Sequence, residues 1–291
     1  MPKSPVAPKP ISILKSVLTL LTRYPIIFYP LVISIFLQLL VLEILFFAPR
    51  PPLSVFFGPL ISRIWGQAYV HYPYNFYLLP KLFYYAQSLL DLLVGSFLLA
   101  VSIRIIGAYN NNERMKPKKA LKDCLPSYLH VFLAACLSYA FFFGFAKLYH
   151  RLYIWAAAIQ APGGIHGTIK KIVMASEIPV QFLAGVFITA LFVYVVPIIV
   201  LEKKKIFGAL WQGLKMFFRS FWVTLFFVLI ATVFYLPVLI ARDRIDLITS
   251  SMFPEMELIV LVLSVICATL LDCVISAAAV TYYLYSKESS K

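Results

Sequence analysis

The sequence predicts an all-helical integral membrane protein with six transmembrane helices. Three observations lead to this fold class. Of the 291 residues, 62% are hydrophobic and 13% are charged, whereas soluble domains are about 45–50% apolar and roughly 25% charged. Six stretches approach the roughly 20 apolar residues that a helix needs to cross the hydrocarbon core. Lysine and arginine gather in alternate connections between these stretches. Together they exclude a soluble enzyme, a disordered chain and a secreted disulfide-linked scaffold.

The six predicted spans are helices because backbone polar groups in lipid must be satisfied within their own segment. The spans cover residues 25–47, 84–108, 130–149, 178–201, 221–241 and 258–284. An even number of spans places both termini on one side. Of the 26 Lys and Arg residues, 17 fall at the termini and in the second and fourth connections. The positive-inside rule therefore predicts cytoplasmic termini, and we expect the protein in the bacterial inner membrane.

The excess of positive charge, formally +14, predicts contact with lipid rather than with nucleic acid. Most cations flank apolar stretches, and the sequence has no zinc-finger spacing or RNA-binding signature. Anionic head groups attract such juxtamembrane clusters. The predicted partners are membrane lipids, together with another membrane protein or a second copy of the chain. Head-group contacts on the cytoplasmic side are expected from six lysines: Lys116, Lys118, Lys119, Lys203, Lys204 and Lys205.

The two longer connections on the opposite side differ from ordinary hydrophilic loops. Residues 50–81 are rich in aromatic side chains, which favour the head-group level of a bilayer. We expect a short helix near residues 53–65, lying along the outer interface or packed over the outer helix ends. In the third connection, the third helix is expected to extend through residue 160. A turn at Pro162-Gly163-Gly164 and an amphipathic piece over 169–176 would follow.

Three cytoplasmic stretches resemble one another and predict an internal repeat. They are residues 13–18, 120–125 and 209–214, each with leucine at its second and sixth positions, and each precedes an odd-numbered span. An amphipathic helix at each place would lie in the inner interface. We expect one membrane domain, residues 1–291, made of three helical hairpins, each preceded by a cytoplasmic amphipathic helix. The repeats would cover 11–108, 117–201 and 206–284; the alternative is three unrelated juxtamembrane helices.

One region resembles a known family. Its residues are Val196-Pro197-Ile198-Ile199-Val200-Leu201-Glu202, a lysine run, Ala209-Leu210 through Leu214, and Phe221-Trp222. The stretch is similar to a bacterial superfamily of six-helix integral membrane proteins that includes the membrane domain of some glycerophosphoryl diester phosphodiesterases. The resemblance is best over 190–240. It implies a proline near the end of the fourth span, a cytoplasmic turn and an amphipathic helix. Because this chain carries no appended phosphodiesterase domain, the resemblance implies an architecture and no activity.

Three acidic residues lie within the predicted spans, and their presence in the membrane needs a physical explanation. An ionisable group inside a span costs about 2.5–3.5 kcal/mol on insertion scales. Asp91 lies seven residues inside the outer end of the second span, roughly 10 Å deep at about 1.5 Å per residue. Glu43 lies at a comparable level near the outer end of the first span, and Asp272 lies near the middle of the sixth.

Small and hydroxylated residues share a helix face with two of these acids. Such residues let helices approach closely and form hydrogen bonds between helices. We therefore expect Asp91 and Asp272 to face the interior of the bundle. The shared faces are Ser264, Ala268, Asp272 and Ser276 on the sixth span, and Ser88, Asp91, Gly95 and Ser102 on the second.

Two interpretations of the acids stay open. In the first, Asp91 and Asp272 line a proton or cation pathway, with Glu43 near its outer mouth. In the second, each acid forms hydrogen bonds to a neighbouring helix, and Glu43 or Asp91 pairs with Lys147 or Arg151. We find no basic partner at mid-depth and no paired broken helices, which favours the structural interpretation.

The predicted function is therefore that of a non-enzymatic structural or accessory subunit of a membrane complex, or of a membrane-homeostasis factor. The alternative is a small transporter or permease for a lipid-like or ionic substrate. Intramembrane proteolysis would need acids at matching depth, and Asp91 and Asp272 differ by several residues. The histidines have no metal-ligand spacing, and no catalytic motif occurs. We expect no catalytic residue, metal or cofactor.

Overall fold

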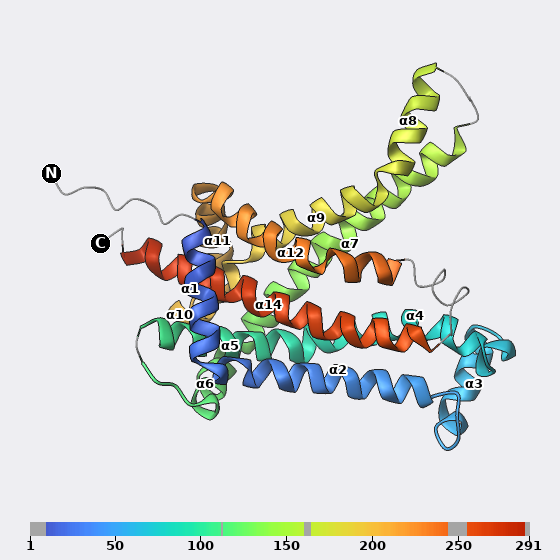
Figure 1. Ribbon diagram of the computed structural model, residues 1–291, viewed down its shortest axis with the longest axis horizontal. Helices are drawn as coiled ribbons and strands as arrows, with labels where there is room; N and C mark the ends of the chain where they lie inside the picture. The colour runs from blue at the N-terminus through green and yellow to red at the C-terminus, as the bar shows by residue number, and fades with distance from the viewer. Residues whose placement is uncertain (1–9, 112, 160–163, 244–254, 289–291) are drawn as a thin grey trace.

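The computed structural model describes residues 10–111, 113–159, 164–243 and 255–288. Within these ranges the secondary structure is helical, with no β-strand, and six helices are long and apolar enough to cross a membrane. The predicted fold class is confirmed: this is an all-helical integral membrane protein (Figure 1).

Several helical segments combine to make the six spans. The first consists of η1 (Pro25–Phe28) and α2 (Tyr29–Phe47). The second consists of α4 (Tyr74–Leu90), η3 (Asp91–Gly95) and α5 (Ser96–Asn110). The third consists of α6 (Pro117–Cys124), η4 (Leu125–Ser127) and α7 (Tyr128–Ala158). The last three are α9 (Glu177–Phe192) with α10 (Val195–Glu202), α12 (Phe221–Asp243) and α14 (Met256–Glu288).

The bundle has two distinct ends (Figure 1). At the terminal end lie α1 (Pro10–Arg23), α6, α11 (Ile206–Arg219) and the last turns of α14. At the opposite, loop end lies α3 (Ser54–Ile64). The hairpin of α7 and α8 (Gly164–Ala175) projects away from the bundle. The first and last described helices thus meet at one end, as an even number of spans requires, and its cytoplasmic location stays a prediction.

Helix α14 forms the centre of the bundle. It packs against α1, α2, α4, α5, α10 and α12. Four consecutive residues in its terminal half, Ala277 to Val280, have no exposed surface. Because consecutive residues of a helix point in different directions, such a run means that α14 is covered on every side. Small side chains here let the neighbouring helices approach closely.

The three short helices α1, α6 and α11 occupy related places. Helix α6 packs on α5, α11 packs on α10, and α1 packs on α14. Each short helix therefore packs against an even-numbered span. For α1, the first helix of the chain, this is the sixth span, α14. The first and fifth positions of the three similar stretches are buried, whereas none of the shared leucines is. The buried pairs are Ile13 and Val17, Ala120 and Cys124, and Ala209 and Gly213. The repeat and its boundaries stay predictions.

Two connections differ in detail from the expected ones. The second span begins at Tyr74 rather than at residue 84, because the helix continues through Pro80. The expected short helix is present as α3, and its Ile61 packs with Ala48 and Leu78, over the ends of α2 and α4. In the third connection α8 covers residues 164–175, more than the expected 169–176. Pro162 and Gly163 of the expected turn lie outside the described residues.

The second and fourth spans each contain a local irregularity within a continuous helix. The second contains one π-helical turn, η3, which begins at Asp91. In the fourth, the α-helical hydrogen-bond pattern gives way to a turn at residues 193–194, while Val193 and Tyr194 keep right-handed helical backbone angles. Pro197 follows as the third residue of α10, where its missing N–H costs no hydrogen bond within that helix. Irregular backbone at membrane depth is tolerated where protein or a water-filled cavity surrounds it.

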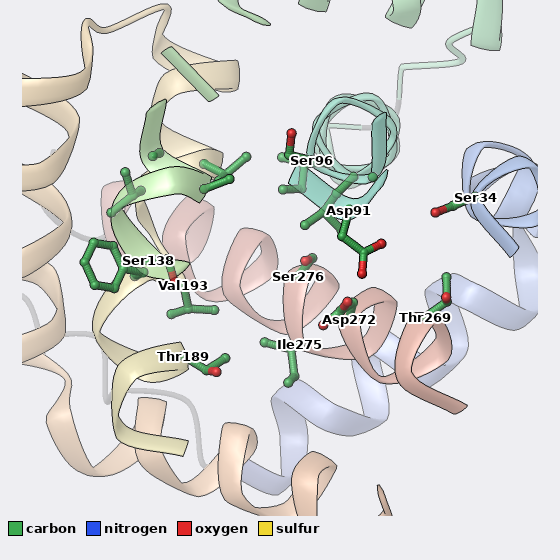
Figure 2. A pocket seen from close by; sticks show the side chains of 18 of the residues that line it. Ser34, Asp91, Ser96, Ser138, Thr189, Val193, Thr269, Asp272, Ile275 and Ser276 are labelled. Carbon is green, nitrogen blue, oxygen red and sulfur yellow. The ribbon is translucent and has the colours of Figure 1, made fainter. Parts of the chain in front are cut away.

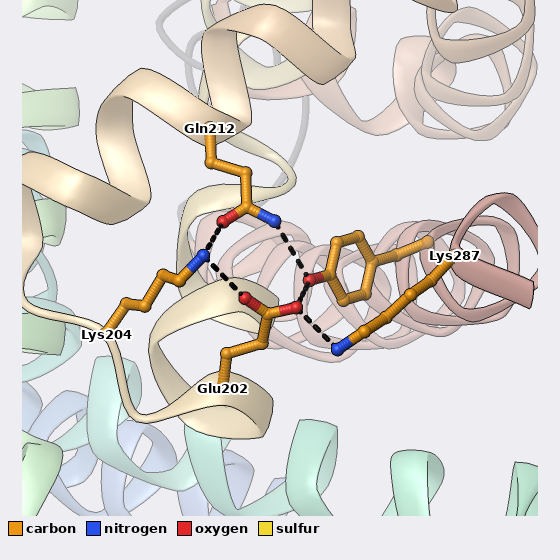
Figure 3. A network of polar contacts seen from close by, with 5 residues as sticks. Glu202, Lys204, Gln212 and Lys287 are labelled. Atoms are coloured by element: carbon orange, nitrogen blue, oxygen red, sulfur yellow. Dashed lines mark hydrogen bonds and ion pairs between the residues drawn. The ribbon is translucent and has the colours of Figure 1, made fainter. Parts of the chain in front are cut away.

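A polar network ties the terminal end of α14 to the turn between α10 and α11 (Figure 3). The Glu202 carboxylate accepts a hydrogen bond from the Tyr283 hydroxyl and lies 2.7 Å from the Lys287 ammonium and 2.9 Å from that of Lys204. Gln212 completes the ring: its Oε1 accepts from Lys204 at 2.5 Å, and its Nε2 donates to Tyr283 at 3.2 Å. Charge-assisted bonds of this kind are stronger than neutral ones.

Replacing Glu202 with alanine is expected to destabilise the protein by about 1–3 kcal/mol, since the tyrosine and the two lysines lose their shared acceptor. Thermal unfolding in mild detergent measures the loss. The matched control is Glu288→Ala, an exposed glutamate at the same end of α14, which should leave the unfolding temperature unchanged. Equal behaviour of the two variants would show that the network adds nothing to stability.

Candidate functional site

A cavity of about 380 Å³ lies inside the bundle. Residues from five of the six spans line it, and only the fifth contributes none. Its wall combines apolar side chains with hydroxyl, amide and carboxyl groups. The polar residues of the lining are Ser34, Gln38, Asp91, Ser96, Ser138, Tyr139, Thr189, Thr269, Asp272 and Ser276.

Asp91 is held at the cavity by an amide chain from the first two spans. Its Oδ1 accepts a hydrogen bond of 2.8 Å from Gln38 Nε2. The Oε1 atom of Gln38 in turn accepts one of 3.0 Å from Gln87 Nε2. The π-helical turn runs from Asp91 to Gly95 and places the two residues next to each other on the helix. A Cβ atom at Gly95 would lie only 3.0 Å from Asp91 Oδ1. The glycine therefore leaves the space that the carboxylate occupies.

Asp272 comes from the central helix α14, yet its side chain is exposed. Because Asp272 lines the cavity, this exposed surface opens onto it. Figure 2 shows the carboxylates of Asp91 and Asp272 pointing into the same space. One turn further along α14, Ser276 also faces the cavity and is only 8% exposed. Within the described part of the chain its hydroxyl has no hydrogen-bond partner.

A second cavity, of about 300 Å³, adjoins the first and reaches toward the loop end. The two share Asp91, Ser138, Tyr139 and Thr189. The second adds Arg242, whose guanidinium lies 3.5 Å from the Ser264 hydroxyl and 5.7 Å from the ring centroid of Tyr84. The pair of cavities therefore extends from the middle of the bundle toward the loop end of α12.

The site has more acidic than basic side chains. The described lining of both cavities includes the two carboxylates and one cation, Arg242. Over the described ranges, no ion pair within 4.0 Å joins Asp91 or Asp272 to a Lys, Arg or His side chain. The same ranges contain no group of three or more His, Cys, Asp or Glu side chains able to hold a metal ion.

The predicted site residues separate into two groups. Asp91 and Asp272 line one cavity, despite the difference in depth that the sequence suggests. Glu43, by contrast, is exposed on α2 and lines neither cavity. Lys147 and Arg151 are exposed on α7 and form no described ion pair with Asp91. Arg242 is the cation near Asp91 instead.

The residues predicted to form packing faces have mixed roles. Ser264 is buried against α12, where its hydroxyl lies 3.0 Å from that of Tyr235. Ser276 faces the cavity, whereas Ala268 is half-buried and does not line it. On the second span, Ser88 lines the second cavity and Gly95 the first.

The six predicted head-group lysines also differ among themselves. Lys204 contacts Glu202 and Gln212 in the polar network. The other five are exposed at the terminal end: Lys116, Lys118, Lys119, Lys203 and Lys205. Head-group contact of these lysines stays a prediction.

Several residues of the site were not among the sequence candidates, including Gln38, Gln87, Tyr139 and Arg242. A glutamine in hydrocarbon needs a hydrogen-bond partner just as an acid does. The glutamines of the first two spans were therefore an available signal. Arg242 gave no such signal, because an arginine near the end of a span commonly extends its side chain to the head-group level.

These observations define a class: an integral membrane protein with a partly open cavity between its spans, lined by two acids and by apolar side chains. Comparison with protein-family models, with curated proteins and with solved structures gives no match for this chain. The resemblance over residues 190–240 therefore stays a prediction, and the functional argument rests on the cavity itself.

Proposed function

We propose that this protein is a non-enzymatic transporter that moves a positively charged solute across the membrane, with Asp91 and Asp272 as its binding groups. The observation that carries the proposal is the presence of both carboxylates, from different spans, in the lining of one internal cavity. Acids inside spans are rare, and by default they mark ion and substrate pathways. A carboxylate without a paired cation attracts a cationic solute or a proton.

Irregular helical segments at the cavity wall support the same function. Asp91 and Gly95 belong to the π-helical turn, and Val193 belongs to the turn between α9 and α10. Single π-helical turns frequently mark functional sites. We assign the change of access between the two sides to these two segments.

The accessory-subunit or homeostasis role has less support. The sequence favours it because it shows no paired broken helices and only one acid in each of these spans. The shared cavity weakens the second of these points, since Asp91 and Asp272 both line it. Exposed apolar side chains such as Phe36 and Phe234 do not favour a protein partner, because every membrane protein presents such surface to lipid.

Purified protein in lipid vesicles tests the proposal. With an inside-negative membrane potential, uptake is measured for three probes: protons with an enclosed pH-sensitive dye, and radiolabelled K⁺ and tetramethylammonium. We expect at least one probe to enter faster than it enters protein-free vesicles. The matched control Glu43→Gln, which neutralises an acid outside the cavities, should keep that uptake. No protein-dependent uptake of any probe would overturn the proposal.

A further inference from the structure

The shape and chemistry of the first cavity narrow the substrate class. Ser276 and Thr269 lie on either side of Asp272 along α14, and Asp91 faces the same space, whereas Ser138 and Thr189 lie further from the carboxylates (Figure 2). On α5, Leu99 and Ile103 follow Asp91 toward the terminal end, and on α10, Val195 and Val196 line the same side. The cavity therefore has an acidic part and an apolar part.

From this division we infer that the solute is an organic ammonium ion with an apolar body, an inference that rests on the proposed transport function. The charged group would lie between Asp91 and Asp272, and the body against Ile103 and Val196. The hydroxyl of Ser276, on the same face of α14 as Asp272, lines the same cavity and offers a further polar group to a ligand.

Size favours an organic ion over a bare one. A volume of about 380 Å³ equals that of about a dozen water molecules at roughly 30 Å³ each. A single inorganic ion would leave most of this space to water lying against apolar side chains. An organic body displaces that water and buries its own apolar surface, which contributes about fourfold in affinity for each methylene removed from water.

The aromatic ring of Tyr139 supports an ammonium group. Tyr139 lines both cavities together with Asp91. A cation near the face of an aromatic ring is attracted by the ring quadrupole, and recognition of quaternary ammonium groups commonly uses this contact. Arg242, in the second cavity, repels a cation and thereby favours binding beside the carboxylates of the first.

Calorimetric titration of the purified protein with three probes tests the inference. The probes are K⁺, tetramethylammonium and phenyltrimethylammonium, which share a charge and differ in the apolar body. We expect phenyltrimethylammonium to bind at least about tenfold more tightly than tetramethylammonium, and K⁺ most weakly. Val196→Thr, which keeps the side-chain shape but adds a hydroxyl to the apolar part, should weaken only phenyltrimethylammonium. Asp272→Asn should weaken both ammonium ions.

The outcomes separate this inference from the proposed function. If K⁺ or tetramethylammonium binds as tightly as phenyltrimethylammonium, the site selects charge alone; the inference then fails while transport stands. If Val196→Thr weakens every probe equally, the apolar part is not a subsite, and the inference also fails. If no probe binds and the vesicles show no protein-dependent uptake, both proposals fail together.

Discussion

Replacing Asp272 with asparagine should reduce cation uptake into vesicles by about tenfold to a hundredfold. The substitution removes the negative charge and keeps the shape of the side chain, so the bundle around α14 needs no rearrangement. Hydrogen bonds to charged groups contribute about 1.5–3 kcal/mol, which corresponds to this range of rates if the contact is lost in the transition state. Uptake per milligram of folded protein, after size-exclusion chromatography, is the relevant measurement.

The control for this variant is Glu43→Gln, which removes the same charge from an exposed position on α2. If both variants lose uptake equally, the effect is one of overall charge and not of the cavity. If Asp272→Asn keeps full uptake, the carboxylate does not bind the solute, and the transport mechanism proposed for this cavity is wrong.

Gly95→Ala should lower uptake by about threefold to tenfold while leaving the protein folded. The added Cβ would lie 3.0 Å from Asp91 Oδ1, so the carboxylate must shift by a few tenths of an ångström, which distorts its hydrogen bond to Gln38. An off-rotamer side chain costs about 0.5–1.5 kcal/mol, which corresponds to this loss if the cost appears in the transport step. Stability should change little, because alanine favours helix by about 1 kcal/mol over glycine.

Gly144→Ala is the matched control, because a Cβ atom at this position on α7 meets no atom within 4 Å. It carries the same change in helix propensity without touching Asp91. Uptake measured side by side with Gly95→Ala should be normal. If Gly95→Ala transports as well as this control, the position of the Asp91 carboxylate does not matter for transport.

The sequence predicts the number and type of spans well, because hydrophobic length alone determines which segments can cross a bilayer. It places the second span too late, since Pro80 reads as a helix end in water but is tolerated in this helix. The π-helical turn at Asp91 and the turn at residues 193–194 are not predicted. A glycine four residues after an acid and a proline near a span end are compatible with both regular and locally irregular helices.

The candidate site was predictable only in part. Helical periodicity correctly suggests that Asp91 and Asp272 point inward, but it does not reveal which spans are neighbours. Whether two inward acids share a cavity depends on the packing of α14 between α2 and α5. The same limit explains Arg242, because its approach to the second cavity depends on where the end of α12 lies. The sequence shows which side chains are acidic or basic, but only the fold shows which of them lie close together.

A cation site at Asp91 and Asp272 requires that water reach the cavity, and cysteine labelling tests this access most directly. In a variant without the four native cysteines, Thr189→Cys places a thiol in the wall of both cavities, and Leu270→Cys places one on the exposed outer face of α14. A charged methanethiosulfonate reagent, applied to both sides of the membrane, requires a hydrated thiolate. We expect rapid labelling of the thiol at position 189 and no labelling of the thiol at position 270. Equal labelling at the two positions, or none at 189, would contradict it.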